Sequence, residues 1–397
     1  MTDGWSASSP GSTSWGRSLP SSAGAPERAV ARVDLGAVER NCRRLRELLT
    51  DGAELCAVVK ADGYGHGAAQ CARAALAGGA SWLAVATAAE AAWLRLRGID
   101  ARILVMGALT PTEVHMALRE DADVVAWTHE FVAALPDRRA GLTRPRVHVK
   151  YDTGMGRLGT RDPDEVRELC RQIAEDPRLE LSGLMTHFAT ADERGDEHFP
   201  AQLRRFTDLV DELRAAHPGL LIHAANSAGT FRDATAAHFH MVRCGVAIYG
   251  LDPFGADPEP LGLTPALSLE SYVAAVKRFE KGDGVGYGQT WRAGAPTCVG
   301  VLPIGYGDGW RRSLSNNARV LVRDRSHPLV GTVSMDNITI DLGPETDVVP
   351  GDRAVLIGRQ GGERILAEEV AARLGTINYE VTCGLTGRVL RAYPREG

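Results

Sequence analysis

The length, composition and charge of the chain exclude several classes of protein before any motif is considered. Its 397 residues, 44% of them hydrophobic, are enough for a barrel-sized α/β domain and a second domain. The 45 Lys and Arg residues against 50 Asp and Glu residues give a formal net charge of -5, so no basic excess indicates binding to nucleic acid or to an anionic membrane. The seven cysteines are scattered and form no C-x-x-C pair, which argues against a disulfide framework and favours a reducing cytoplasm.

The first 28 residues are rich in Ser, Gly, Pro and Ala. They lack the continuous apolar segment of a signal peptide, and no later apolar run is long enough to cross a membrane. We therefore expect residues 1–28 to be a disordered tail. After it, residues 30–35 predict a strand, and apolar residues at helical spacing follow Asp34.

Short apolar runs then alternate with helical stretches up to residue 243. The runs are typical of buried parallel strands, and the stretches between them are rich in Ala, Leu, Arg and Glu. About eight such strand–helix units predict an α/β fold, a parallel (β/α)8 barrel of the TIM type. The expected strands are 55–59, 82–86, 103–106, 122–126, 147–150, 181–185, 220–224 and 241–243.

From about residue 263 the pattern changes to β-rich runs broken by Gly, Pro and Asp, at 273–276, 297–302, 320–322, 330–333, 338–342 and 353–357. These runs predict a mainly antiparallel second domain. The expected division is a tail at 1–28, a barrel domain at 29–262 and a C-terminal β domain at 263–397.

Unusual polar residues stand at the ends of several predicted barrel strands. In a (β/α)8 barrel the carboxyl ends of the strands form one mouth, which is where the chemistry takes place. We therefore expect these side chains to converge there. They are Lys60 after the first strand, Lys150 and Arg157 at the fifth, His187 after the sixth, Asn226 and Ser227 after the seventh, and Arg243 and Gly245 at the eighth.

The segment 57–67, Ala-Val-Val-Lys-Ala-Asp-Gly-Tyr-Gly-His-Gly, is the most informative stretch. A lysine at a strand end that is partly desolvated is nucleophilic in its neutral form and can form a Schiff base, although an ion-paired lysine is an open alternative for Lys60. The glycines leave room for backbone N–H groups and for the Tyr64 hydroxyl to approach a bound phosphate.

Together with eight further motifs in the same order, this segment resembles the alanine racemases, pyridoxal-phosphate enzymes built of a barrel and a β domain. The resemblance spans residues from about 30 to 393. The further motifs are Lys-Tyr-Asp-Thr-Gly-Met-Gly-Arg at 150–157, Thr-His-Phe at 186–188, Asn-Ser at 226–227, Val-Arg-Cys-Gly at 242–245, Val-Gly-Tyr-Gly at 285–288, Gly-Tyr-Gly-Asp-Gly at 305–309, Met-Asp at 335–336 and Ile-Asn-Tyr-Glu at 377–380.

The resemblance implies a two-base racemase. Lys60 would hold pyridoxal 5′-phosphate covalently and serve as the base on one face of the substrate, and Tyr287 from the partner subunit would serve on the other. Both pKa values must be lowered for work near neutral pH, because lysine and tyrosine ordinarily titrate near 10. The cofactor phosphate would be held by Tyr64, Ser227, Tyr379 and the backbone at Gly245 and Val246.

Further roles follow from the same resemblance. Arg243 would face the pyridine nitrogen, with His187 and Asn226 in support, and Arg157 would meet the substrate carboxylate or the cofactor phenolate. In many members the lysine that matches Lys150 is carbamylated, giving an anion that orients the arginine. Tyr306, Met335 and Asp336 would join Tyr287 in the partner's site, so the enzyme would be a cytoplasmic homodimer that interconverts L- and D-alanine.

Several alternatives stay open from the sequence. The same mechanism could serve serine or another amino acid, and a decarboxylase or a non-racemising pyridoxal-phosphate barrel would share the fold. The bulky Trp310 bears on this choice, because Tyr306 is expected at the substrate entrance. His238 and His240 could belong to a metallohydrolase, but packed histidines are the commoner case, so no metal is expected.

Overall fold

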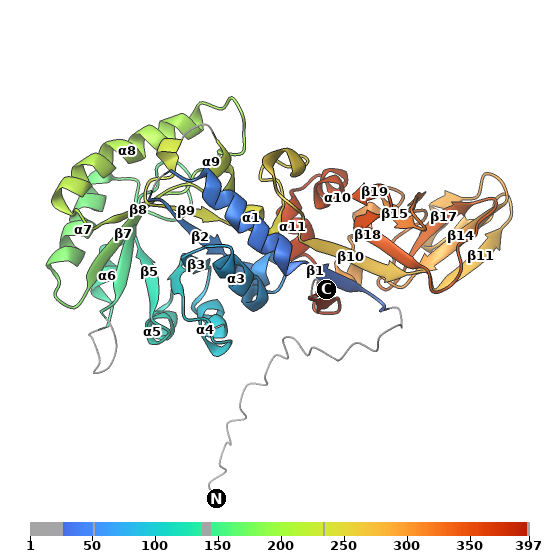
Figure 1. The fold of residues 1–397 in the computed structure, drawn as a ribbon, viewed down its shortest axis with the longest axis horizontal. Helices are drawn as coiled ribbons and strands as arrows, with labels where there is room; N and C mark the ends of the chain where they lie inside the picture. The colour runs from blue at the N-terminus through green and yellow to red at the C-terminus, as the bar shows by residue number, and fades with distance from the viewer. Residues whose placement is uncertain (1–26, 51, 137–143, 233–234, 395–397) are drawn as a thin grey trace, which may run out of the picture.

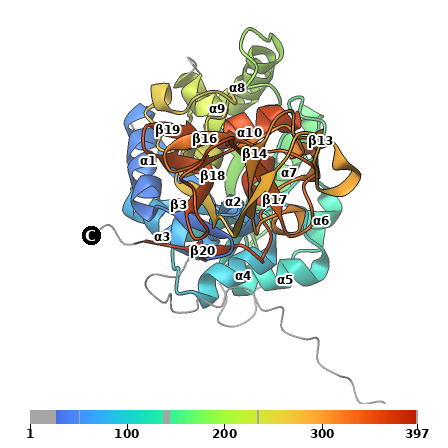
Figure 2. The same ribbon diagram turned by 90° about the vertical axis from the view of Figure 1, so that its right-hand side faces the viewer.

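The computed structural model describes residues 27–50, 52–136, 144–232 and 235–394. Nearly all of the tail predicted at residues 1–28 lies outside these ranges. Within them the chain forms a barrel lobe and a β lobe, which lie side by side along the long axis (Figure 1). Figure 2 looks along that axis, with the β lobe in front of the helices that surround the barrel. None of the described helices is long and apolar enough to span a membrane.

The barrel lobe is built on parallel strands that close into a barrel. Each strand pairs with the next one along the chain, and the last closes on the first where Met241 aligns with Glu54. All of them overlap the apolar runs expected as strands, so the predicted (β/α)8 barrel is confirmed. The strands are β2 (Glu54–Val58), β3 (Trp82–Val85), β4 (Arg102–Val105), β5 (Ala122–Ala126), β6 (Arg146–Lys150), β7 (Glu180–Met185), β8 (Leu221–His223) and β9 (Met241–Cys244).

The barrel helices turn apolar faces inward. In α7 the buried residues Val166, Leu169 and Ile173 recur at three- and four-residue intervals, which places them on one face. At the start of α4, Thr87 accepts a hydrogen bond from the N–H of Glu90, whose carboxylate accepts one in return, so the sequence caps its own helix. The helices are α1 (Leu35–Leu48), α3 (Ala68–Ala77), α4 (Ala88–Leu96), α5 (Pro111–Arg119), α6 (His129–Ala133), α7 (Pro163–Glu175), α8 (His198–Ala216) and α9 (Ser227–Phe231).

The β lobe holds a sheet of order β16-β15-β18-β10-β1-β20, in which β1 is Val30–Val33, a sheet of order β11-β14-β17 and the pair β12-β13. Nearly all of its strand pairs are antiparallel, as predicted. Its elements are β10 (Leu267–Tyr272), β11 (Ala275–Phe279), β12 (Gly284–Val285), β13 (Trp291–Arg292), β14 (Thr297–Leu302), β15 (Arg319–Val322), β16 (Arg325–Pro328), β17 (Ile338–Gly343), β18 (Arg353–Gln360), β19 (Glu363–Ile365), α10 (Ala367–Leu374), α11 (Asn378–Cys383) and β20 (Leu390–Ala392).

The first strand of the chain, β1 (Val30–Val33), belongs to the sheet of the β lobe. It pairs antiparallel with β10 and parallel with β20, the last strand. The two ends of the described chain therefore meet in one sheet beside the barrel (Figure 1). The division at residues 262 and 263 stays a prediction, and β1 contributes to the β lobe from the N-terminal side of it.

Candidate active site

Lys60 lies just beyond β2, at the carboxyl-terminal end of the barrel, and the backbone after it turns in an unusual way. In the segment α2 (Lys60–Tyr64), the φ angles of Ala61, Asp62, Gly63 and Tyr64 are 52, 51, 62 and 52°, so the chain makes a left-handed turn. A non-glycine residue in this conformation costs roughly 1–2 kcal/mol. Strain of this kind persists only where surrounding contacts hold it, and it is concentrated at functional sites.

Side chains of the barrel lobe hold this turn. The carboxylate of Glu90 accepts a hydrogen bond from the N–H of Ala61 at 2.6 Å, and the carboxylate of Asp62 accepts one from the N–H of Ala68 at 2.9 Å, at the start of α3. The ring of His66 donates from Nδ1 to the carbonyl of Tyr64 at 2.9 Å. Burial lowers the pKa of His66 to about 4, so this ring is neutral.

The β lobe supports the same turn from the other side. Arg391 donates to the carbonyl of Gly65 at 3.0 Å, and the Tyr393 hydroxyl donates to the carbonyl of His66 at 3.2 Å. A Cβ on Gly65 would overlap the carbonyl of Thr382, and one on Gly67 would overlap the Tyr393 hydroxyl. Both glycines also have positive φ, so the alternating glycines permit this close approach of the two lobes.

Arg243, in β9, carries a guanidinium group into the interior of the barrel. One terminal nitrogen donates to the carbonyls of Thr186 and Ala224, at 2.8 and 3.0 Å, and lies 3.3 Å from His187 Nδ1. The other lies 3.0 Å from Nδ1 of His223. These partners are all neutral, and burial lowers the pKa of Arg243 to about 10, which still leaves it charged near neutral pH.

The loop that carries Arg157 folds around Asp152. The carboxylate of Asp152 accepts hydrogen bonds from the N–H groups of Gly154, Met155 and Gly156, at 3.1, 2.7 and 3.0 Å. This explains the Asp-Thr-Gly-Met-Gly pattern, since the acceptor and the unhindered backbone are both needed for so tight a loop. The loop brings the exposed Arg157 close enough to act electrostatically on Lys60 and Lys150.

The chain contains only four lysines, and two of them lie at this mouth. Burial, followed by the charge of Arg157, lowers the pKa of Lys60. Burial, followed by the charges of Arg243 and Arg157, lowers the pKa of Lys150 to about 8. For His187 the same two causes, burial and the charge of Arg243, lower the pKa well below its ordinary value. Burial and, after it, the two arginines therefore increase the fraction of each amine that is neutral near neutral pH.

A group of hydroxyls and backbone N–H groups lies beside the lysines. The Ser227 hydroxyl accepts hydrogen bonds from the N–H groups of Gly245 and Ala247, at 3.0 and 3.4 Å. A Cβ on Gly245 would overlap the Tyr64 hydroxyl, whose ring lies 6.1 Å from that of Tyr379. Within the described chain neither tyrosine hydroxyl takes part in a hydrogen bond. We call the group of Tyr64, Ser227, Gly245, Val246 and Tyr379 the hydroxyl cradle.

Asn226 has a structural task next to the hydroxyl cradle. Its side chain accepts a hydrogen bond from the N–H of Gly229 at 2.9 Å and so caps α9, which begins with Ser227. Among the described residues this side chain makes no hydrogen bond with Arg243, whose own backbone N–H bonds to the carbonyl of Ala225 at 2.9 Å.

The remaining predicted site residues lie on the surface of the β lobe. The exposed fractions of Tyr287, Met335 and Tyr306 are 73%, 51% and 39%, and Asp336 is also exposed, paired with Arg388 at 2.6 Å. The backbone carbonyl of Tyr287 accepts from the Thr332 hydroxyl at 2.8 Å, within the β lobe. No described contact joins any of these residues to Lys60 in the same chain.

Sequence reasoning missed three buried polar residues that lie between Arg243 and the amino-terminal end of the barrel. His223 contacts Arg243 directly, and His148 and Asp123 continue the contact through the barrel. One signal was available: His148 lies two residues before Lys150 on the same strand, and alternate residues of a strand face the same side.

The contacts of His238 and His240 bear on whether these residues are metal ligands or packed histidines. His238 is buried between the N–H of Thr50, at 3.3 Å, and the carbonyl of Thr230, at 3.2 Å, and His240 accepts from the N–H of Ile222 at 3.1 Å. Both rings therefore bond to the backbone as packed histidines.

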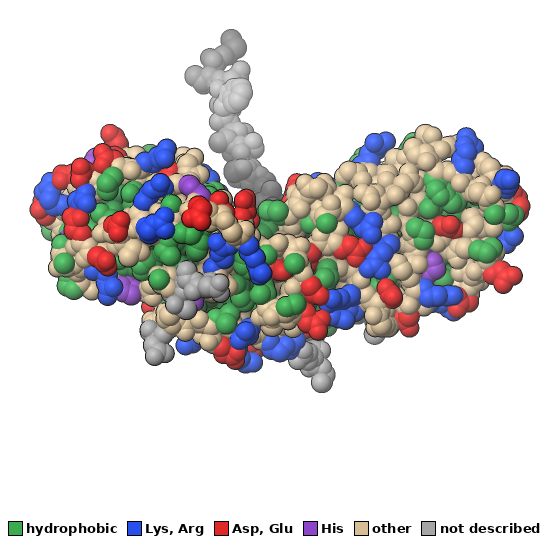
Figure 3. Space-filling view, turned by 90° about the horizontal axis from the view of Figure 1, so that it is seen from above, with side chains coloured by type: hydrophobic (Ala, Val, Ile, Leu, Met, Phe, Trp, Pro, Cys, Tyr) green, Lys and Arg blue, Asp and Glu red, His purple; other side chains and the backbone are tan. Residues whose placement is uncertain are grey.

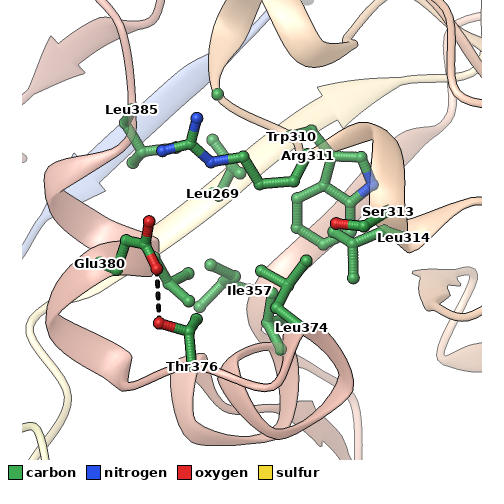
Figure 4. Close-up of a pocket in the computed structure, with 13 residues that line it drawn as sticks. Leu269, Trp310, Arg311, Ser313, Leu314, Ile357, Leu374, Thr376, Glu380 and Leu385 are labelled. Carbon is green, nitrogen blue, oxygen red and sulfur yellow. Dashed lines mark hydrogen bonds between the residues drawn. The ribbon is translucent and has the colours of Figure 1, made fainter.

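Trp310 follows Tyr306, which is expected at the substrate entrance, but its own side chain is buried in the β lobe. It is only 2% exposed and lines a pocket of about 260 Å³ together with Leu269, Ile357 and Leu385. This pocket lies among β10, β18 and α11, and none of the predicted site residues lines it (Figure 4). The side chain of Trp310 therefore packs inside the β lobe.

Comparisons with known proteins agree with this geometry. The family model of the alanine racemase N-terminal domain matches residues 33–253, and that of the C-terminal domain matches residues 266–393. The alanine racemase of Symbiobacterium thermophilum is 44% identical over 369 residues, which cover 92% of this chain and 97% of that protein. Alanine racemase 1 of Bacillus subtilis is 40% identical over 371 residues, covering 92% and 93%.

Solved structures give the same result. The alanine racemase of E. faecalis superposes with a TM-score of 0.86 at 36% identity and covers 93% of this chain and 98% of its own. The enzyme of a Streptomyces lavendulae that produces D-cycloserine has the same TM-score and identity, covering 94% and 98%. Because the matches include both lobes and nearly the whole length, this chain belongs to the alanine racemases, enzymes that use pyridoxal 5′-phosphate to interconvert L- and D-alanine.

Proposed function

We propose that the barrel mouth of one subunit binds pyridoxal 5′-phosphate at Lys60, and that the α-proton of alanine is exchanged by Lys60 on one face and by the partner subunit's Tyr287 on the other. One observation carries the proposal. Lys60 is a desolvated amine on a strained, doubly supported turn, between the hydroxyl cradle and two arginines. Such a position fits a reacting amine better than an ion-paired lysine, because the described structure gives Lys60 no carboxylate partner.

The residues of the mouth fit this cofactor. The hydroxyl cradle offers the phosphate unengaged tyrosine hydroxyls at Tyr64 and Tyr379, and a serine whose oxygen already accepts from the backbone and whose proton can point outward. Many converging neutral donors suffice for a phosphate. The lack of a Cβ at Gly245 keeps the Tyr64 hydroxyl close to the backbone there. Asn226 supports the cradle by fixing the start of α9.

Bound pyridoxal phosphate supplies a conjugated ring that withdraws the electron pair left when the Cα–H bond breaks. Arg243 would face the ring nitrogen, with His187 beside the guanidinium. As a charged donor near neutral pH, the guanidinium disfavours a proton on that nitrogen. This limits electron withdrawal by the ring and so favours return of the proton over side reactions of the carbanion.

The proton moves between two bases. Nζ of Lys60 takes or returns it on one face, and Oη of the partner subunit's Tyr287 does so on the opposite face. The lowered pKa of Lys60 increases the fraction of neutral amine near neutral pH. Arg157 would bind the carboxylate of alanine and so orient Cα between the bases.

We propose a homodimer because the second base lies on the surface of the β lobe. Tyr287, Tyr306 and Met335 are among the few large apolar side chains that the described surface exposes. Exposed apolar residues grouped with an ion pair such as Asp336 with Arg388 are typical of an interface. We also propose that the enzyme acts in the cytoplasm, a reducing compartment that suits its free cysteines. We propose that it binds no nucleic acid, because acidic and basic side chains are interspersed on the face that Figure 3 shows.

We propose that Lys150 is carbamylated. Its pKa of about 8 leaves part of the amine neutral near neutral pH, and this form adds carbon dioxide, forming an N–C bond and releasing one proton. The carbamate would face two cations, Arg157 and Arg243, in place of a third positive charge.

Labelled bicarbonate tests this modification. We expect a ¹³C carbamate signal in the purified enzyme that weakens as the pH falls through about 8, because protonated amine does not react with carbon dioxide. The signal should be absent from Lys150→Gln and present in Lys281→Gln, which changes a lysine of the β lobe. An undiminished signal in Lys150→Gln would contradict the assignment.

The substitution Lys60→Ala tests the cofactor site. We expect racemisation to fall by roughly a thousandfold or more, since the variant loses both the covalent anchor and one base. Borohydride reduction of the parent enzyme, followed by peptide mass mapping, should place the cofactor on the peptide that contains Lys60. Lys277→Ala, which removes an exposed lysine, is the control. Cofactor found on another lysine, or normal turnover by Lys60→Ala, would refute the proposal.

The substitution Tyr287→Phe tests the second base. We expect turnover to fall by on the order of 10²–10⁴-fold, because only the hydroxyl that carries the proton is removed. Exchange of the α-proton with deuterated water should slow far more for L-alanine than for D-alanine. Equal slowing for both enantiomers would show that Tyr287 does not serve one face alone.

A further inference from the structure

A line of buried hydrogen bonds runs through the barrel from Arg243 to its amino-terminal end. Nη1 of Arg243 lies 3.0 Å from Nδ1 of His223, and Nε2 of His223 lies 2.8 Å from Nδ1 of His148. Nε2 of His148 lies 3.0 Å from the carboxylate of Asp123. Both histidines and Asp123 are fully buried. We call Asp123, His148 and His223 the barrel relay.

A glycine leaves space for the relay, and two arginines bind Asp123, its residue nearest the amino-terminal end of the barrel. Asp123 is the second residue of β5, and its carboxylate also accepts from Arg102 and Arg146, the first residues of the neighbouring strands, at 2.9 and 2.6 Å. The ring of His148 fits only because residue 183 is glycine, since a Cβ there would overlap the ring. Burial alone would raise the pKa of Asp123, but the hydrogen bond from His148 and the two arginines lower it to about 2.

The donors and acceptors of the relay can be assigned without ambiguity. The carboxylate of Asp123 can only accept, so Nε2 of His148 carries the proton; the guanidinium of Arg243 can only donate, so Nδ1 of His223 is bare. The bond between the rings then runs from Nε2 of His223 to Nδ1 of His148. Both ends of the relay demand the same direction, and both rings are neutral.

A charged histidine would break this pattern. Protonation of Nδ1 in His148 would force Nε2 of His223 to accept, and a neutral His223 would then present an N–H to Arg243. Burial and the charge of Arg243 lower the pKa of His223 well below its ordinary value, in agreement with a neutral ring.

We infer that Asp123 is a positioning residue for racemisation: through His148 and His223 it fixes the tautomer that accepts from Arg243, and so holds the guanidinium in its orientation toward the mouth of the barrel. The inference rests on the proposed role of Arg243 toward the cofactor ring. It assigns a function to a carboxylate at the opposite end of the barrel from the chemistry. The substitution of a buried carboxylate that orients a histidine is known to leave geometry intact while selecting the wrong tautomer.

The substitution Asp123→Asn tests the inference, because it keeps the shape of the side chain and adds a donor beside His148. The amide of Asn has only one oxygen to accept from His148, Arg102 and Arg146. Its NH2 group would therefore meet the N–H of His148, and to relieve this conflict between two donors His148 and His223 would each move their proton from Nε2 to Nδ1. In the holoenzyme we expect kcat to fall by on the order of tenfold, with little change in KM. This magnitude is typical of residues that orient another side chain without contacting the bound group themselves. The visible absorption band of the bound cofactor should shift in the same direction as in Arg243→Lys.

The matched control is Asp121→Asn. Asp121 also pairs with Arg146, at 2.9 Å, but it lies on the surface outside the relay, so both kcat and the absorption band should stay as in the parent enzyme. If Asp123→Asn gives parental kcat and a parental band while Arg243→Lys shifts the band, the relay has no positioning role. If Arg243→Lys leaves the band unchanged, the proposed role of Arg243 fails instead.

A measurement on the unaltered enzyme covers the case in which Asp123→Asn does not fold. In ¹⁵N-histidine-labelled holoenzyme, His148→Gln and His223→Gln assign the two ring signals. The inference requires both rings to be neutral with the proton on Nε2. A proton on Nδ1 of either ring would overturn it.

Discussion

The structure depends on one buried positive charge, the guanidinium of Arg243. A charge taken out of water is costly unless polar groups replace the solvent, and here the described partners are two carbonyls and two histidine rings. Because none of them neutralises the charge, it acts on its surroundings. Burial is the main reason why the pKa values of Lys60, Lys150 and His187 are lowered, and the charges of Arg243 and Arg157 lower them further. The charge that would disfavour a proton on the cofactor ring nitrogen thus also helps to lower the pKa of the amines around it.

The proposed reaction also requires that Lys60 be held in a fixed position, and contacts from both lobes provide this. The left-handed turn after β2 is strained, and its carbonyls are bound by Arg391 and Tyr393 at the end of the chain. The strand β1 joins β20 to the sheet of the β lobe, so the segment that supports the turn is itself fixed by the beginning of the chain. The β lobe therefore stabilises the barrel site of its own subunit, while the proposed function assigns its exposed face with Tyr287 to the site of another subunit.

Much of this could be predicted from the sequence, for physical reasons. Buried parallel strands are continuous apolar runs, so the barrel strands could be located, and the polar residues at their ends marked Lys60, Lys150 and Arg243. Partners distant in sequence leave no such pattern. Nothing in residues 30–33 tells that β1 pairs in the other lobe. The run at 330–333, predicted as a strand, lies outside the strands and is held by bonds to separate segments, such as the one from the N–H of Val330 to the carbonyl of Thr339 and the one from the N–H of Val333 to the Ser315 hydroxyl. Glycines indicated the turn after Lys60, but positive φ at Ala61 and Asp62 depends on contacts from Glu90 and α3. The barrel relay joins three separate strands, and Trp310 could not be placed until its packing was known.

The central claim is that each active site takes one base from each of two subunits, and mixed dimers test it most directly. Subunits with Lys60→Ala and subunits with Tyr287→Phe can be produced together with different affinity tags and purified as heterodimers. In such a dimer one site lacks both bases and the other keeps both, so the account predicts about half the activity of the parent dimer, far above either mutant homodimer. Activity in the heterodimer no higher than in the two homodimers would contradict it, because both bases would then have to come from the same chain.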